Sequence, residues 1–226
     1  MRKRAVVWVG IGISIPFILV VSVLCGAQAG KVESIGALTD SAVPESIRQT
    51  LDAKGYRLTL DDPTPACELW IRKSIPAQAK KDVEGVAYPQ LAESTLVAVI
   101  HFLQAAEDFR AHRIPAGFYT LRYEIMPNDG NHLGAAPNRD FLLAIPAASD
   151  PDPNATFKLQ ELVTMSARTS GMKHPSPLSL AQRDSGPSTP TVSKDDQDHW
   201  TFSAAMKLNS GEDLPFALVV KGTAQQ

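Results

Sequence analysis

Two short stretches of the chain contain residues of the types that bind divalent metals. Asp129, Asn131 and His132 belong to the run PNDGNH, which follows a predicted strand, and His174 lies in the run GMKHPSP. Carboxylate oxygens and imidazole nitrogens are common ligands of divalent metals, and Pro175 restricts His174 to extended backbone. If the two loops meet in space, Asp129, His132 and His174 would form a three-ligand site with an open position, as in metal-dependent hydrolases.

The same DGNH run is also ordinary turn chemistry. Asp and Asn side chains accept hydrogen bonds from their own backbone, and Gly permits the dihedral angles that tight turns need. A metal-binding loop and a structural turn are therefore both compatible with Asp129 and His132. The sequence favours the turn and keeps the metal site as the alternative.

No sequence motif of a common enzyme class is present. The chain contains no GxSxG, HExxH, GxGxxG or phosphate-binding loop, no CxxC pair and no EF-hand loop. Many active sites leave no local signature, so this result weakens an enzymatic function without excluding it. Whether the protein is an enzyme stays open here, and no cofactor is indicated apart from the divalent metal of the alternative site.

The N-terminus has the layout of a secretory signal peptide. Arg2, Lys3 and Arg4 precede an uncharged apolar run over residues 5–25, and AQA at residues 27–29 is a small-x-small cleavage site. We therefore expect residues 1–29 to be removed and the protein to be periplasmic or secreted. The run at 5–25 is also long enough to cross a bilayer. An uncleaved anchor in the inner membrane is the alternative, and membrane contact is expected only through that segment.

The charge and cysteine content limit the class of partner and the means of stabilisation. The chain has 22 Lys and Arg against 24 Asp and Glu, and three of the cations lie in the signal segment. The exported part is therefore acidic, which disfavours nucleic acid as a partner because phosphate binding needs clustered positive charge. Cys67 would be the one cysteine left after cleavage, so no internal disulfide can form. A buried core must stabilise the domain.

Hydrophobic patterning predicts about eight strands and two short helices. One helix is expected over residues 44–54 and another over residues 159–167, with Gly171 beyond its end. The remaining apolar segments either alternate with a period of two or are apolar throughout, as strands do. The predicted strands are 56–60, 67–75, 94–103, 118–126, 139–147, 177–181, 199–208 and 214–222.

The order of these elements predicts the fold class. The strands follow one another in neighbouring pairs and do not alternate with helices, which favours a mainly β fold. We expect an antiparallel β-sandwich or open barrel of about eight strands with two short helices. Residues 182–198, rich in Ser, Thr, Pro and charge, are predicted to be a flexible surface loop. Residues 30–226 would then form a single β-rich domain.

The strand predicted at residues 118–126 has one apolar and one polar face. Thr120, Arg122 and Glu124 alternate with aromatic and aliphatic residues, a pattern typical of a strand with one face in water. Arg139 and Asp140 open the next predicted strand. We therefore expect exposed cross-strand ion pairs between these two strands, with a structural role.

Four segments together resemble a family of exported bacterial proteins of unknown function. They are IPAGFYTLRYEIMPNDGNHLG, RDFLLAIPA, HPSPLSL and LPFALVV. In that family a PAGxYTLRY strand runs into a PxDGNHxG loop and then an RDF strand, and the resemblance extends from Leu91 to Gly222. It implies an extracytoplasmic β-rich domain and provides no activity to assign to Asp129 or His132.

These observations favour a non-catalytic, exported β-sandwich that binds an unknown protein or small-molecule ligand. The export signal and the β pattern support that function, and the missing motifs weaken a catalytic one. The alternative is a metal-binding protein or metal-dependent hydrolase that uses the DGNH loop with His174. The two hypotheses differ in whether Asp129, His132 and His174 converge.

Overall fold

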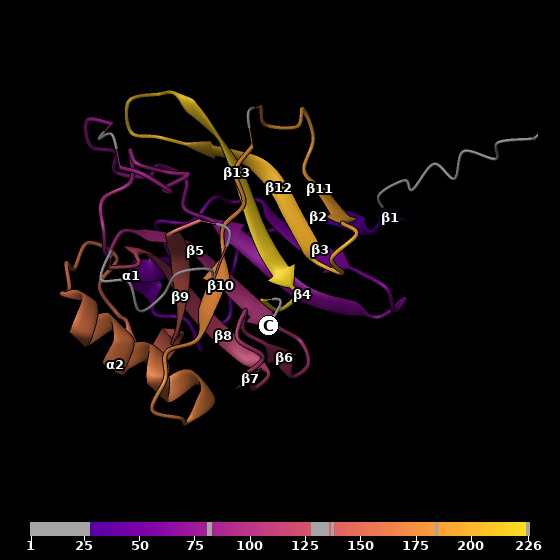
Figure 1. Ribbon diagram of the computed structural model, residues 1–226, viewed down its shortest axis with the longest axis horizontal. Helices are drawn as coiled ribbons and strands as arrows, with labels where there is room; N and C mark the ends of the chain where they lie inside the picture. The colour runs from indigo at the N-terminus through magenta and orange to yellow at the C-terminus, as the bar shows by residue number, and fades with distance from the viewer. Residues whose placement is uncertain (1–27, 81–82, 128–135, 137, 184, 225–226) are drawn as a thin grey trace, which may run out of the picture.

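The protein, represented by a computed structural model, folds into two antiparallel β-sheets with two helices on one side (Figure 1). The structure describes residues 28–80, 83–127, 136, 138–183 and 185–224. The elements in chain order are β1 (Gln28–Ala29), β2 (Lys31–Ile35), α1 (Glu45–Arg48), β3 (Gly55–Thr59), β4 (Pro65–Ile71), β5 (Leu96–Phe102), β6 (Ala106–Glu107), β7 (Arg113–Ile114), β8 (Gly117–Ile125), β9 (Asp140–Pro146), the 3-10 helix η1 (Ala147–Ser149), α2 (Leu159–Ser170), β10 (Pro177–Ser179), β11 (Thr191–Lys194), β12 (Trp200–Lys207) and β13 (Asp213–Lys221).

The strands form a large sheet and a small one. The large sheet has the order β10-β9-β8-β5-β4-β3-β2, and the small sheet has the order β1-β11-β12-β13. Every neighbouring pair is antiparallel, and β6 and β7 form a separate two-stranded ribbon. In Figure 1 the orange and yellow strands β11, β12 and β13 make one layer against strands of the large sheet such as β3, β4 and β5. The predicted antiparallel sandwich with two helices is therefore confirmed.

The two sheets do not close into a barrel, and they are joined at several places, of which two are corners of the sandwich. At the first corner Gly30 separates β1 from β2, so the chain passes from the small sheet to the large one, and its N–H donates to Val192 O at 3.0 Å. A Cβ on Gly30 would stand 2.6 Å from Thr59 O, so only glycine fits there. At the second corner an isolated bridge joins Leu180 to Leu218.

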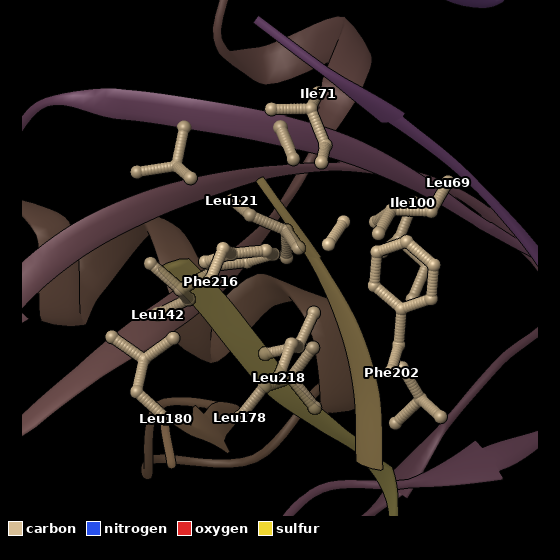
Figure 2. Close-up of a cluster of buried hydrophobic side chains, with 14 of the residues drawn as sticks. Leu69, Ile71, Ile100, Leu121, Leu142, Leu178, Leu180, Phe202, Phe216 and Leu218 are labelled. Atoms are coloured by element: carbon tan, nitrogen blue, oxygen red, sulfur yellow. The ribbon is translucent and has the colours of Figure 1, made fainter. Parts of the chain in front are cut away.

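The main hydrophobic core lies between the two sheets. Figure 2 shows Phe202, Phe216 and Leu218 of the small sheet among large-sheet side chains that include Ile100 and Leu121. All five are almost fully buried, between 0% and 1% exposed. Burial of apolar area is the dominant stabilising contribution in such a core. Cys67 is the one cysteine among the described residues, and it is a free thiol.

The outer face of the large sheet is covered as well. Ile47 of α1 packs with Trp70 and Val99, and Leu162 of α2 packs with Leu143 of β9. The central strand β5 is consequently buried on both faces, as its apolar sequence predicts. Helix α2 ends at Gly171 with a left-handed φ of 68°, which confirms the predicted helix end.

The prediction that one face of β8 is exposed to solvent is wrong. Thr120, Arg122 and Glu124 are between 0% and 1% exposed. The 3-10 helix η1 and the segment after it pack on β8, and α2 packs on the neighbouring strand β9. The expected exposed ion pairs to β9 are replaced by a buried ion pair between Arg122 and Asp150. Alternation in the sequence shows which residues share a face and does not show whether that face meets water.

Arg122 is the centre of this buried polar layer. Its Nε and Nη2 bind the two carboxylate oxygens of Asp150, each at 2.8 Å. The other donors reach the carbonyl oxygens of Ser94 at 2.7 Å, Ala155 at 3.0 Å and Asp152 at 2.6 Å. All five guanidinium N–H groups thus have acceptors, which is what a fully buried arginine requires.

The prediction of a loop over all of residues 182–198 is also wrong. Residues 191–194 form β11, which pairs with β12 on one side and with β1 on the other. Val192 is 2% exposed and packs in the main core. A single β-branched apolar residue among polar neighbours was enough to anchor this short strand.

The predicted signal segment lies almost wholly outside the described residues, which begin at residue 28. Among the helices of the described part, none is long and apolar enough to span a bilayer. Gln28 and Ala29, which precede the predicted cleavage point, form β1 and pair with Lys194 and Ser193. Cleavage after Ala29 would therefore detach an edge strand of the small sheet.

Candidate functional site

A cavity of about 490 Å³ opens between the two sheets at one end of the sandwich. It lies where the turn after β3, the turn after β5, the turn between β11 and β12 and the C-terminal end of β13 come together. Its volume falls in the range of known small-molecule sites, and the junction between two structural layers is a common position for one.

The floor of the cavity is apolar. Among its lining residues, Cys67 and Phe102 are 1% exposed and Val220 is 4% exposed. They lie on β4, β5 and β13, so both sheets contribute to the floor. Burial, followed by the nearby charge of Glu68, raises the pKa of the Cys67 thiol to about 12. Cys67 is therefore a neutral thiol at ordinary pH and behaves as a small apolar residue.

The rim of the cavity is polar and mostly acidic. Its exposed lining includes four carboxylates and one ammonium group. They are Asp61, Asp62, Glu107, Asp198 and Lys221. An apolar floor beneath a charged rim suits a ligand that has an apolar body and a polar end.

Asp61 ties the two sheets together at this rim. Its Oδ2 accepts hydrogen bonds from Lys221 Nζ at 2.8 Å and from Trp200 Nε1 at 2.9 Å, and its Oδ1 lies 3.4 Å from Lys194 Nζ. The hydrogen bond from Lys221 is the main cause that lowers the pKa of Asp61 to about 2. Asp61 is therefore a fixed anion at neutral pH.

His174, one of the three predicted metal ligands, lies at a different cavity of about 310 Å³. This second cavity is mostly apolar and is also lined by Pro127 and Ala136, the described residues nearest to the two ends of segment 128–135. The His174 ring is nearly parallel to that of His112, with centroids 5.9 Å apart. His112 Nδ1 in turn lies 3.2 Å from Oδ2 of the buried Asp108.

Asp129 and His132, the other two predicted ligands, lie outside the described residues. Within the described ranges, no group of three or more His, Cys, Asp or Glu side chains is arranged to hold a metal ion. The structure therefore brings His174 to a cavity beside the flanks of the DGNH loop and leaves the three-ligand site a prediction.

The residues of the inter-sheet cavity gave no recognisable signal in the sequence. Well over a hundred residues separate Asp61 from Trp200 and Lys221 in the sequence. Each of the three stands at the end of a strand or in a turn. The run DDPTP was recognisable as a turn. Its position opposite the last strand depends on the sheet order, which the sequence does not show.

Comparison with known proteins adds no relative. No family model matches the chain, and neither the curated proteins nor the solved structures contain a significant match. The resemblance based on the PAGFYTLRY and DGNH segments therefore stays a prediction.

Proposed function

We propose that the protein is an exported, non-catalytic binding module that holds a small ligand in the cavity between its two sheets. The observation that carries the proposal is the cavity itself, about 490 Å³ with an apolar floor and a charged rim. Sites of this size and composition bury most of a small ligand while a few polar groups orient it.

The protonation states of the lining groups favour binding over catalysis. A general acid or base works best with a pKa near the operating pH. Asp61 has a pKa lowered to about 2 and Cys67 a pKa raised to about 12, so neither exchanges a proton near neutral pH. The pKa of Asp62 is lowered as well, chiefly by the hydrogen bond that its carboxylate accepts from the Thr64 backbone.

Export is supported by the N-terminal charges, the apolar run at residues 5–25 and the AQA sequence. The cleavage position also affects the small sheet, because cleavage after Ala29 would remove residues 28 and 29, which pair with β11. N-terminal mass measurement of the exported protein tests this part of the proposal. A chain that begins at residue 30 is the expected product, and an intact N-terminus would instead mean a membrane-anchored protein.

Filling the mouth of the cavity tests the binding site directly. A panel of small amphiphilic compounds is first screened for those that raise the melting temperature, since a ligand that binds the folded state stabilises it. Thr64→Trp places a large side chain at the exposed rim and is expected to abolish the stabilisation. Thr164→Trp, on the exposed face of α2, is the matched control and should retain it. Equal stabilisation of both variants would contradict the proposed site.

The alternative function is a metal-binding protein or metal-dependent hydrolase that uses Asp129, His132 and His174. The position of His174 beside Pro127 and Ala136 favours it, because the flanks of the DGNH loop reach the same cavity. Elemental analysis of the purified protein and of His132→Ala and His174→Ala tests it. Stoichiometric metal that both variants lose would support the metal site, and a metal-free protein would leave DGNH as a turn.

A further inference from the structure

We infer that the ligand of the inter-sheet cavity is a small organic cation with an apolar body, of the alkylammonium class. This inference rests on the proposed binding function and adds the chemical class of the ligand. It follows from two properties of the same cavity, the apolar floor and the excess of carboxylates on its rim.

The floor selects the apolar body. Phe102 and Val220 offer no hydrogen-bonding side chain, and the Cys67 thiol is neutral and weakly polar. A charged or strongly polar group buried against these side chains would lose its hydration and would gain no hydrogen bond in exchange. The part of the ligand that reaches the floor is therefore hydrocarbon, and each methylene removed from water there contributes favourably.

The rim selects the charged end. Its one lining cation, Lys221, already binds Asp61 at 2.8 Å, and Asp198 is bound by Lys194 at 2.8 Å. An anionic ligand would therefore compete with Asp61 for Lys221 while facing carboxylates around the rest of the rim. A cationic ligand meets the opposite situation, because two carboxylates, Asp62 and Glu107, form no ion pair within the described residues.

Glu107 is the best placed of these carboxylates. It is exposed, lies on the short strand β6 and lines the cavity. Arg113 stands opposite it in the β6–β7 ladder, yet the two side chains form no ion pair in the part of the chain that the structure describes. Asp62 uses one carboxylate oxygen to accept the Thr64 N–H and keeps its charge because its pKa is lowered. Because Asp62 and Glu107 are both exposed, each is expected to form an ordinary surface ion pair with a ligand cation, of modest strength.

Three compounds with the same six-carbon chain separate charge from hydrophobicity. Isothermal titration of the full exported protein with hexylammonium, 1-hexanol and hexanoate at pH 7 is expected to rank them in that order of affinity. Hexylammonium should bind at least about three-fold more tightly than hexanol, the effect of one exposed ion pair. Equal binding of all three, or tighter binding of hexanoate, would overturn the cation inference and leave the binding function standing. Saturable binding of none would contradict both.

Charge-removing variants locate the effect. Glu107→Gln and Asp62→Asn are each expected to weaken hexylammonium by about two- to five-fold and to leave hexanol unchanged. Glu212→Gln removes the same charge at the β12–β13 turn, at the opposite end of β13 from Lys221, and should change neither affinity. If Glu107→Gln and Asp62→Asn weaken hexylammonium no more than Glu212→Gln does, the rim carboxylates do not recognise the cation.

Discussion

Charged side chains are used in opposite ways in two regions of this protein. In the buried layer outside β8, Arg122 has an acceptor for each of its five donors, and its partner Asp150 is likewise 0% exposed. At the rim of the inter-sheet cavity, carboxylates outnumber the lining cation, and Asp62 and Glu107 form no ion pair with any residue that the structure describes. The first arrangement is complete within the chain and is structural. The second is incomplete and is suited to a ligand.

Glu124 lies on the same face of β8 as Arg122, two residues further along the strand. Unlike Arg122, it does not have all of its hydrogen-bonding groups satisfied. It is 1% exposed, and its Oε2 has no hydrogen-bond donor among the described residues. Burial, and after it the neighbouring Glu93 carboxyl, raises the pKa of Glu124 to about 8. A neutral, protonated Glu124 avoids the cost of an unpaired buried charge.

The largest expected effect comes from breaking the complete arrangement. Asp150→Ala leaves the guanidinium of Arg122 buried without its counter-charge. It also removes the nearer acceptor of the Thr120 hydroxyl and leaves only Ile145 O at 3.4 Å. We expect a loss of about 3–5 kcal/mol in the free energy of unfolding, the range for a broken buried ion pair. Urea denaturation at pH 7 measures it.

A double variant shows whether the unpaired charge causes that loss. Arg122→Met combined with Asp150→Ala removes the charge as well as its partner, so part of the stability lost in Asp150→Ala should return. The recovery should be incomplete, because the carbonyl groups of Ser94, Asp152 and Ala155 lose their donor. A loss below about 1 kcal/mol in Asp150→Ala would mean that the Arg122–Asp150 ion pair does not have the structural role assigned to it.

A smaller effect, and one that depends on pH, is expected at Glu124. Its pKa is about 8 in the folded protein against 4.5 for an ordinary glutamate. Between pH 4.5 and pH 8 the folded state therefore holds a proton on Glu124 that the unfolded state has released. The contribution of Glu124 to stability is complete below pH 4.5 and is lost as the pH rises through 8. The free energy of unfolding should fall by on the order of 1–3 kcal/mol across this window.

Glu124→Gln is the test of that assignment. The amide carries no charge at any pH, so the fall in stability between pH 5 and pH 8.5 should become smaller in the variant. Any slope that remains in Glu124→Gln belongs to other groups, and Asp140 is one candidate because burial raises its pKa as well. Parallel urea titrations of wild type and variant measure the difference. Identical slopes would show that Glu124 is ionised in the folded protein.

The architecture was largely predictable from the sequence. The period-two patterns and turn residues located the main strands, and the apolar strand at residues 96–102 is central and buried on both faces as expected. The environment of β8 was not predictable, because the residue that neutralises Arg122 is Asp150, 28 positions away in a turn-rich segment. Val192 was missed because one apolar residue creates no periodic pattern.

The candidate site was harder to predict than the fold. Metal-ligand types drew attention to Asp129, His132 and His174, since those side chains carry a chemical signature. Asp61, Glu107 and Lys221 have no such signature, and their grouping depends on the order of strands in two sheets. A cavity built from strand ends depends on topology, so the sequence alone does not show it.

The smallest effect on stability is expected at the rim, with Asp61→Asn. Hydrogen bonding from Lys221 lowers the pKa of Asp61 to about 2, so its contribution is present above the ordinary value of 3.8 and is lost as the pH falls through 2. The Asp61 side chain is 36% exposed, and solvent screening limits the loss at pH 7 to less than about 1 kcal/mol. Urea denaturation at pH 7 and at pH 2.5 should show the difference from wild type shrinking at the lower pH. A loss as large as that of Asp150→Ala would make Asp61 as structural as the buried ion pair and would remove the distinction between the two regions. A small loss is what a charge screened by solvent gives.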